Sequence, residues 1–536
     1  MISRAEFNPT PRSPSLPLGP PRTIRLLAIL LLALGALHAV AYMAPFEDAY
    51  ITYRYAEHLA SGLGFVYNAG ERVEGCTSLA WTTLLAAVIR LGLPVELTSQ
   101  LLSICSGLAL AWATLRLSRV LVARHASDGW QLLPIAGVIA SGTWAYYAGS
   151  GMETTTFAAL IAAAARLSIV EKNSRISIAA GLLFGLAAMT RPEAIGYMAA
   201  VALAVLLGES RRDAFRLTLG FMSLYILFFA ARYWYFGYPL PNTYYAKASP
   251  SLTLFEAGIV HAEAFLTSQA FWLPFAAAVG LGIARRQQRA WRVVSAVVLT
   301  AFLNAIFVGG DTFPQFRIFL PAIPFGAVAL AEAVRDLNKR GQSRPTTLVS
   351  ESLVAVWTIY TFAAQFLPTR TLLSRRPQSE WDRGTTIGQM NCDYFEVGAW
   401  LHKNVKADAL LAVNAAGIVP YVSGLRTLDM LGLTNEHIAH LRQNLGPGTI
   451  GHEKHDAQYV LSRQPDIILL GLPVLTARRL TPAEFEPWFG RWFPYLPGDR
   501  KLFYSEKFRR MYTPVSVAIG DKYFAFFLRN GPVRAQ

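Results

Sequence analysis

Two adjacent carboxylates, Glu47 and Asp48, closely follow an apolar run at residues 25–41. If that run crosses a membrane, the acidic pair lies at the lipid–water boundary, where a carboxylate can act as a general base or as a nucleophile. A neighbouring carboxylate and partial burial raise the pKa of one member of such a pair toward neutrality, as a base requires. Tyr50 and Arg54 follow on what reads as an interfacial helix, and Arg54 is a candidate ion-pair partner. A solvated, charged loop is the plainer alternative.

Arg191 stands in the motif TRPE after another apolar run. A guanidinium fork suits a phosphodiester better than the point charge of a lysine, so Arg191 is a candidate phosphate contact. A helix-end ion pair with Glu193 explains it equally well. Further candidates for the phosphate are Arg54, Lys247 and Arg317, and candidates for contacts with the rest of a substrate are Tyr50, Glu153, Glu193, Tyr244, Tyr245 and Asp311. A turn explains Asp311 equally well, and an aromatic belt at a membrane interface explains Tyr244 and Tyr245.

The elements that must position these residues are membrane helices. The chain has 536 residues, of which 53% are hydrophobic and 15% are charged, and its mean hydropathy is +0.33. A soluble protein carries about 25% charged residues, whereas long apolar stretches recur along the first two thirds of this chain. The pattern predicts a polytopic α-helical membrane protein. The net charge of +15 lies mostly in Lys and Arg clusters between apolar runs, and no nucleic-acid-binding motif accompanies them.

The basic clusters also predict the orientation. Arginines at positions 4, 12, 22 and 25 precede the first run, which places the N-terminus in the cytoplasm. The later clusters alternate correctly if residues 78–92 lie along the interface, and eleven spans with an extracytoplasmic C-terminus then result. The spans are expected at residues 25–43, 97–118, 130–148, 155–170, 176–190, 195–208, 217–236, 269–284, 293–308, 318–334 and 347–366. Nearly every unusual polar motif then falls on the outer face, as in a pocket at the membrane surface.

Three parts of the chain are expected. Residues 1–24, rich in Pro and Ser, form a disordered cytoplasmic N-terminus; residues 25–368 form the transmembrane domain; and residues 369–536 form an extracytoplasmic α/β domain. Short apolar runs at 409–414, 427–432, 466–471, 515–520 and 523–529 predict strands, and 394–405 predicts an amphipathic helix. The three cysteines form no disulfide framework and no metal-ligand spacing, and whether Cys76 and Cys392 pair is left open.

Several motifs carry a resemblance to a known family. They are EDAYITYRYAEHLASGLGFVYNAGERVEGCTS (47–78), GMET (151–154), TRPEA (190–194), FGYPLPNTYYAK (236–247), GGDTFPQFR (309–317) and NAAGIVPYVSGLRTLDMLGLTNEHIAH (414–440). The chain resembles the GT-C superfamily of glycosyltransferases, and more closely the branch of bacterial terminal arabinofuranosyltransferases and pilin arabinosyltransferases. Members of this branch commonly show Asp-Asp where this chain has Glu47-Asp48. The resemblance therefore points to Asp48 as the essential carboxylate and leaves the role of Glu47 open.

The resemblance implies sugar transfer on the outer face of a bacterial inner membrane, from a polyprenyl-phosphate donor to a glycan or protein acceptor. Arabinofuranose is the expected sugar, and mannose or glucose on the same lipid is the alternative within the fold. The residue types fit such a donor, because apolar spans suit an isoprene tail and arginines suit a phosphate leaving group. No cofactor is required, although a divalent metal is a possibility, and nucleic acid is not an expected partner. A lipid-linked sugar transporter or flippase is the rival class, but it would place charged groups at mid-membrane.

Overall fold

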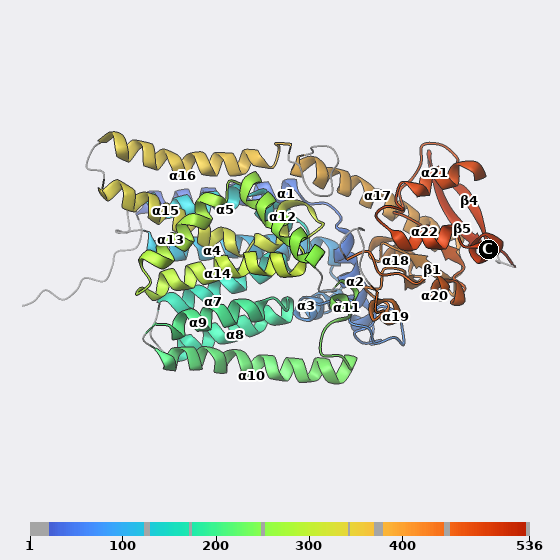
Figure 1. Cartoon of the computed structure of the whole chain (residues 1–536), viewed down its shortest axis with the longest axis horizontal. Coiled ribbons are helices and arrows are strands. Elements are labelled where there is room, and N and C mark those ends of the chain that lie inside the picture. Colours follow the sequence, from blue (N-terminus) through green and yellow to red (C-terminus); the bar gives the residue numbers. More distant parts are fainter. Residues whose placement is uncertain are drawn as a thin grey trace, which may run out of the picture.

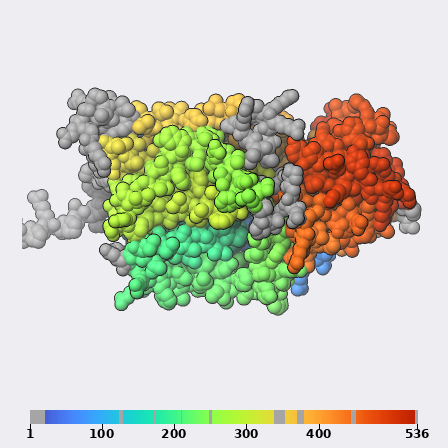
Figure 2. Space-filling model, viewed as in Figure 1, coloured from blue at the N-terminus to red at the C-terminus, as the bar shows by residue number. Residues whose placement is uncertain are grey.

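The computed structural model describes residues 21–122, 129–170, 174–208, 210–247, 252–340, 344–368, 379–443 and 451–531. The predicted disordered N-terminus therefore lies almost entirely outside the described residues. Figure 1 shows a bundle of long helices with a smaller domain at one of its ends, and Figure 2 shows that domain seated directly against the bundle. Helices α2, α3 and α11 lie at the end of the bundle that faces the smaller domain.

Within its described residues the bundle contains helices and connecting loops but no strands. They are α1 (Arg22–Ala41), α2 (Glu47–Ala60), α3 (Leu79–Arg90), α4 (Val95–Leu121), η1 (Gly129–Leu132), α5 (Leu133–Ala140), α6 (Gly142–Gly149), α7 (Thr154–Val170), α8 (Ser174–Thr190), α9 (Ala194–Leu206), α10 (Arg211–Phe236), α11 (Asn242–Lys247), α12 (Leu252–Ser268), α13 (Trp272–Ala284), α14 (Arg289–Val308), η2 (Pro314–Phe319), α15 (Ala322–Arg340) and α16 (Arg344–Ala364).

Four helices, α1, α4, α10 and α14, are long and apolar enough to cross a membrane. Two bent pairs, α6 with α7 (120°) and α12 with α13 (103°), raise the number of candidate spans among the described residues to six. The chain is thus a multi-pass membrane protein, but the predicted count of eleven spans is not confirmed. Every predicted span is helical, yet 130–148 is broken between α5 and α6, and the segment predicted to be a loop between the spans 217–236 and 269–284 contains helix α12.

Small residues allow the helices to approach one another closely. A side chain at Gly181 of α8 or Gly220 of α10 would collide with the backbone of the other helix. Such contact between small residues is a main source of helix association in lipid, where the hydrophobic effect gives no advantage to burial. Conversely, α10 exposes large apolar side chains such as Leu227 and Trp234, as a helix that faces lipid does.

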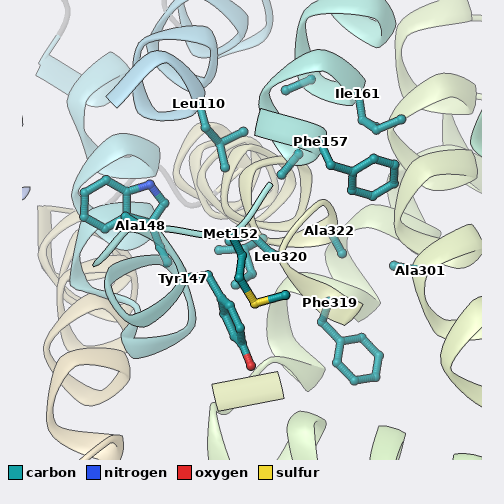
Figure 3. Packing of buried hydrophobic residues seen from close by; sticks show 14 of the residues in the cluster. Leu110, Tyr147, Ala148, Met152, Phe157, Ile161, Ala301, Phe319, Leu320 and Ala322 are labelled. Carbon is teal, nitrogen blue, oxygen red and sulfur yellow. The ribbon is translucent and has the colours of Figure 1, made fainter. Parts of the chain in front are cut away.

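The break between α6 and α7 is buried. Figure 3 shows Met152, which lies in this break, among Tyr147 of α6, Leu320 just after η2 and Ala322 of α15. Tyr147 and Phe319 are fully buried. This packing holds two neighbouring chain segments in place, namely residues 150–153 and the loop that ends in η2, and both supply charged side chains to the site.

The smaller domain contains helices on a five-stranded sheet with the strand order β2-β1-β3-β5-β4. β1 runs parallel to β2 and β3, whereas β5 runs antiparallel to β3 and β4. The predicted α/β character of the C-terminal part is therefore confirmed. Its elements are α17 (Glu380–Asn404), β1 (Leu410–Val413), α18 (Ile418–Ser423), β2 (Arg426–Asp429), α19 (Glu436–Ala439), α20 (Ala457–Ser462), β3 (Ile467–Ile468), η3 (Pro482–Glu484), α21 (Phe485–Gly490), α22 (Pro497–Phe503), α23 (Glu506–Met511), β4 (Tyr512–Ile519) and β5 (Lys522–Arg529). The three cysteines are unpaired.

Candidate functional site

Six of the predicted site residues gather at the end of the bundle next to the smaller domain. They come from four separate places in the chain: the first turn of α2, the α6–α7 break, the α8–α9 junction and the segment between α14 and α15. We call this group the acid–arginine cluster; it comprises Asp48, Glu153, Arg191, Glu193, Asp311 and Arg317. The predicted convergence of acidic and basic motifs from distant segments is thus present in the structure.

Arg191 is held between two carboxylates. Its Nη1 donates to Glu153 Oε1 at 3.0 Å, and its Nη2 donates to Glu193 Oε1 at 3.1 Å. Although burial opposes the charge, Glu193 and Glu153 raise the pKa of the Arg191 guanidinium above its usual value. The ion pair with Glu193 that the sequence left open is therefore present. A second carboxylate from the α6–α7 break joins it, which ties the two helix junctions together.

Arg317 connects the other members of the cluster. Its Nε donates to Asp311 Oδ2 at 2.8 Å, and its guanidinium lies over the Phe313 ring. Burial opposes its charge, but Asp311, Asp48 and Glu153 together raise the pKa of Arg317 well above its usual range. Among the described residues, no group accepts a hydrogen bond from its two terminal nitrogens. These nitrogens are therefore available to an anionic ligand.

The backbone that presents Arg317 is strained. Gln315 and Phe316 have φ values of 64° and 54°, in the left-handed region that non-glycine residues rarely adopt. Such a conformation costs on the order of 1–3 kcal/mol per residue and persists only where surrounding contacts impose it. Here the Gln315 N–H donates to Glu380 Oε2 at 2.6 Å, and the Tyr147 hydroxyl donates to the Pro314 carbonyl at 2.7 Å. This backbone conformation turns the chain so that Arg317 meets the other members of the cluster.

Asp48 differs from the other carboxylates of the cluster. Glu153, Glu193 and Asp311 each pair with an arginine, whereas Asp48 has no hydrogen-bond or ion-pair partner within the described part of the chain. Its side chain is partly exposed, and its charge acts on Arg317. The oxygens of Asp48 are therefore open to a ligand, and its charge lies within electrostatic reach of Arg317. This is the arrangement that a general base requires.

Lys247 and His261 lie at the margin of the cluster. Burial opposes the ionised form of Asp311, but the nearby charges of Arg317, His261 and Lys247 lower the pKa of its carboxyl. His261 was not predicted; it lies on α12, and its ring contacts the rings of Phe316 and Phe319. A lone histidine in the apolar segment 252–268 was the only sequence signal for it.

Glu47 faces away from this chemistry and toward the smaller domain. Its two carboxylate oxygens accept hydrogen bonds from the backbone N–H groups of Gly417 (2.6 Å) and Ile418 (2.9 Å), at the beginning of α18. Burial raises the pKa of Glu47 to about 7, and these hydrogen bonds oppose that rise. The carboxylate oxygens of Glu47 are thus already occupied by the smaller domain.

Arg54 binds the C-terminal end of α18. Its Nη1 donates to the Pro420 carbonyl at 2.7 Å and its Nη2 to the Leu425 carbonyl at 2.8 Å, while its Nε donates to the Tyr67 carbonyl at 2.8 Å. Arg54 is buried and is not brought into the acid–arginine cluster. Tyr50 likewise packs on rings of the smaller domain, with ring centroids 5.2 Å from Phe395 and 5.4 Å from Tyr421. Helix α2 therefore presents Asp48 to the cluster, whereas its Glu47, Tyr50 and Arg54 contact the smaller domain.

Tyr244 and Tyr245 lie on α11 at the junction of bundle and domain. Tyr244 is 47% exposed, and the Tyr245 ring packs against His440 at 4.1 Å between centroids. Neither residue enters the acid–arginine cluster, although α11 ends at Lys247, which acts on Asp311.

Several polar atoms around the cluster lack partners. Among the described residues, Glu193 Oε2, Tyr197 Oη, Thr154 Oγ1 and His261 Nε2 are buried and make no hydrogen bond. Buried polar groups in native proteins are nearly always paired, so such a concentration indicates that a polar ligand or ordered water completes the site. Metal ligation finds no comparable support, because no group of three or more His, Cys, Asp or Glu side chains within the described residues is arranged to hold a metal ion.

Comparisons with known proteins bear on the fold. Residues 383–526 match a family model described as Domain of unknown function (DUF8728). No curated protein matches the chain. Solved structures are similar over most of it: ArnT from Cupriavidus metallidurans bound to undecaprenyl phosphate has a TM-score of 0.52 at 12% identity, covering 94% of this chain and 97% of ArnT.

Archaeal proteins give the same result. The apo oligosaccharyltransferase of Archaeoglobus fulgidus has a TM-score of 0.54 at 10% identity, covering 94% of this chain and 75% of that one. AglB from the same organism, in complex with an inhibitory peptide and a dolichol-phosphate, has a TM-score of 0.52 at 10% identity, covering 96% and 76%. These likenesses show that the chain has the GT-C fold, as the sequence resemblance predicted.

Proposed function

We propose that this chain is a membrane glycosyltransferase that moves a sugar from a polyprenyl-phosphate donor to a glycan or protein acceptor. The observation that carries the proposal is that an unoccupied carboxylate, Asp48, lies within electrostatic reach of Arg317, whose terminal guanidinium nitrogens are available, at one end of an apolar bundle. The fold supports it, because structures of ArnT and AglB with this fold hold undecaprenyl phosphate and dolichol-phosphate. A donor of this class needs apolar walls for its lipid and cations for its phosphate, and the chain has both.

The geometry supports the following roles in the proposed reaction. Asp48 accepts the proton of the acceptor nucleophile as that nucleophile attacks the anomeric carbon of the donor sugar. The bond between the anomeric carbon and the phosphate oxygen breaks, and polyprenyl phosphate leaves with the bonding electrons. Arg317 and Arg191 stabilise the charge that develops on the phosphate, while Lys247 adds a cation at the edge of the site. Glu153, Glu193 and Asp311 orient the arginines.

The identity of the sugar rests on the sequence resemblance, which favours arabinofuranose over mannose or glucose. A transporter of lipid-linked sugars is the second candidate. It would place charged groups at mid-membrane, whereas the acid–arginine cluster lies at an end of the bundle. Both questions are settled by one assay, in which purified protein receives polyprenyl phosphate labelled with arabinofuranose, mannose or glucose, together with envelope glycans. The proposal requires release of free polyprenyl phosphate together with sugar transfer, fastest with arabinofuranose; movement of intact donor across a bilayer without cleavage would support the transporter.

Removing Arg317 is expected to lower the rate of transfer by about 10- to 150-fold, because it deletes a charge-assisted hydrogen bond worth roughly 1.5–3 kcal/mol. Arg317→Ala should show this loss, and Arg317→Lys should restore it only in part, since a lysine cannot reproduce the fork. Arg191→Ala should act in the same direction. Initial rates at several donor concentrations are the measurement, and Arg479→Ala, an exposed arginine of the smaller domain, is the control. Normal rates in Arg317→Ala would contradict the phosphate role.

The smaller domain is proposed to lie outside the cytoplasm of a bacterial inner membrane, with the domain boundary near residue 368. The alternation of basic clusters supports this orientation. Alkaline phosphatase, which is active only outside the cytoplasm, is expected to be active when fused after residue 368 and inactive when fused after residue 342. The opposite pair of activities would reverse the orientation.

A further inference from the structure

A pocket of about 650 Å³ lies where the segment before α3 meets the smaller domain. We call it the junction pocket. It is lined by residues 71–73, by one end of β1, by the edge strand β2, by α19 and by α20. Pockets that bind small molecules have volumes of about 300–1,000 Å³. The junction pocket is therefore large enough for a few sugar residues, and it is separate from the acid–arginine cluster.

The charges in this pocket favour an anionic ligand. Both of its carboxylates are occupied, since Glu71 pairs with Arg426 at 2.5 Å and Glu436 accepts a hydrogen bond from Tyr238. By contrast, two of the arginines that line the pocket are not occupied by other side chains. The exposed side chains of Arg72 and Arg463 have no hydrogen-bond or ion-pair partner in the part of the chain that the structure describes, and Arg72 only packs over a tyrosine ring. Two unpaired guanidinium groups in one pocket match carboxylate or phosphate groups.

The pocket is unsuited to a peptide that extends the sheet. β2 is the outermost strand, so its free edge would be the place for an added strand. The Asn68 side chain already closes that edge, because its Nδ2 donates to the Thr427 carbonyl at 2.8 Å and its Oδ1 accepts from the Thr427 N–H at 3.1 Å. Aromatic rings are present instead: His437 packs on Tyr459 with 4.0 Å between centroids. Rings and guanidinium groups together suit a charged saccharide.

Helix α11 connects the pocket to the reaction centre. Its Tyr245 packs on His440, which lines the pocket, and it ends at Lys247, which acts on Asp311. A helix of six residues is about 9 Å long. A glycan chain whose end reaches Asp48 could therefore place a more distant sugar in the junction pocket.

The geometry points to the junction pocket as a binding site for an anionic segment of the acceptor glycan, a few sugars away from the reacting hydroxyl. This inference rests on the proposed function for its role, but binding can be measured without donor or catalysis. The structure of the pocket assigns Arg463 and Arg72 to the negative groups of the saccharide. A neutral saccharide of the same length should bind much more weakly.

The test uses the full chain in nanodiscs of phosphatidylcholine and a fluorescent hexamer of galacturonic acid as the probe. The wild-type chain should bind this acidic hexamer, and Arg463→Ala and Arg72→Ala should weaken the Kd by about 10- to 150-fold. Arg479→Ala, which removes an exposed arginine of the same domain outside the pocket, is the matched control and should bind normally. Maltohexaose, which is neutral, should bind at least about tenfold more weakly than the acidic hexamer.

Three results would overturn the inference: no binding of the acidic hexamer, equal affinities in Arg463→Ala and Arg479→Ala, or loss of binding when phosphatidylglycerol is added to the nanodiscs. The last result would make the pocket a site for lipid headgroups. A chain that binds the acidic hexamer through Arg463 but transfers no sugar would refute the proposed function and leave the pocket assignment standing. Sugar transfer without such binding would refute the pocket assignment and leave the proposed function standing.

Discussion

Replacing Asp48 with asparagine is expected to lower the rate of sugar transfer by about 10²- to 10⁴-fold, the range found when a general base is lost. Asparagine has nearly the same shape but cannot accept the proton of the acceptor. The fold should not change, because Asp48 is partly exposed and has no hydrogen-bond or ion-pair partner among the described residues. Donor affinity should change little, since Arg317 and Arg191 are still present.

The measurement is transfer of labelled sugar by purified variants, with thermal unfolding and binding of polyprenyl phosphate checked in parallel. Glu57→Gln is the matched control, since Glu57 is an exposed carboxylate on the same helix, and its rate should equal that of the wild type. Glu47→Gln should lose less activity than Asp48→Asn, because Glu47 is bound to the smaller domain. Normal turnover by Asp48→Asn, or a larger loss in Glu47→Gln, would move the base to another carboxylate.

The membership of the acid–arginine cluster was largely predictable. Glu153, Arg191 and Asp311 stand in short polar motifs at the ends of apolar runs, and the alternation of basic clusters predicts that those ends lie on one side of the membrane. Helices that cross a membrane leave few positions for charged side chains, so such motifs must meet in the same layer. Sequence reasoning could thus identify the layer of the site and most of its charged residues.

The contacts of Glu47 and Arg54 could not be predicted in the same way. Their partners, Gly417 and Pro420, lie 370 and 366 residues further along the chain, and no local periodicity connects such positions. The strained conformation of Gln315 was equally hidden, because it depends on Glu380 and not on any turn sequence. Long-range packing decides both features. The sequence could therefore place an acidic pair at the membrane surface without showing which member was free.

The helices were predicted better than the spans they form. An apolar run shows that a segment is helical and lipid-compatible, but it does not show where a short break turns the chain. The predicted span 130–148 contains Ser141, which lies in extended conformation between two short helices. Helix α12 lies in the predicted loop between the spans 217–236 and 269–284, and the chain bends by 103° between α12 and α13. Hydropathy alone does not distinguish such broken or re-entrant segments from straight spans.

Arg54 is expected to be the residue whose loss most weakens the docking of the smaller domain. With Glu47 it holds α18 by both ends: Glu47 accepts from the N–H groups at the beginning, and Arg54 donates to carbonyls at the end, so each charge also complements the dipole of the helix. Its guanidinium is buried, and it lies over the Tyr67 ring at 4.6 Å. Removing it leaves the Tyr67 carbonyl without a donor in a buried interface, where an unpaired group is costly. It also removes one donor each from the carbonyls of Pro420 and Leu425, which keep the Gly424 N–H and the Thr427 hydroxyl as partners.

Arg54→Met keeps the apolar stem but removes all of these donors, so we expect a loss of stability on the order of 3 kcal/mol at the interface. Hydrogen exchange should rise at the amides of Gly417 and Ile418, and the catalytic rate should fall because α2, which carries Asp48, is no longer fixed. Arg426→Met is the matched control: its pair with Glu71 is exposed on both sides, and surface pairs contribute about 0–1 kcal/mol. If Arg54→Met and Arg426→Met show the same exchange at Gly417, then α18 is held by apolar packing and not by the two charges of α2.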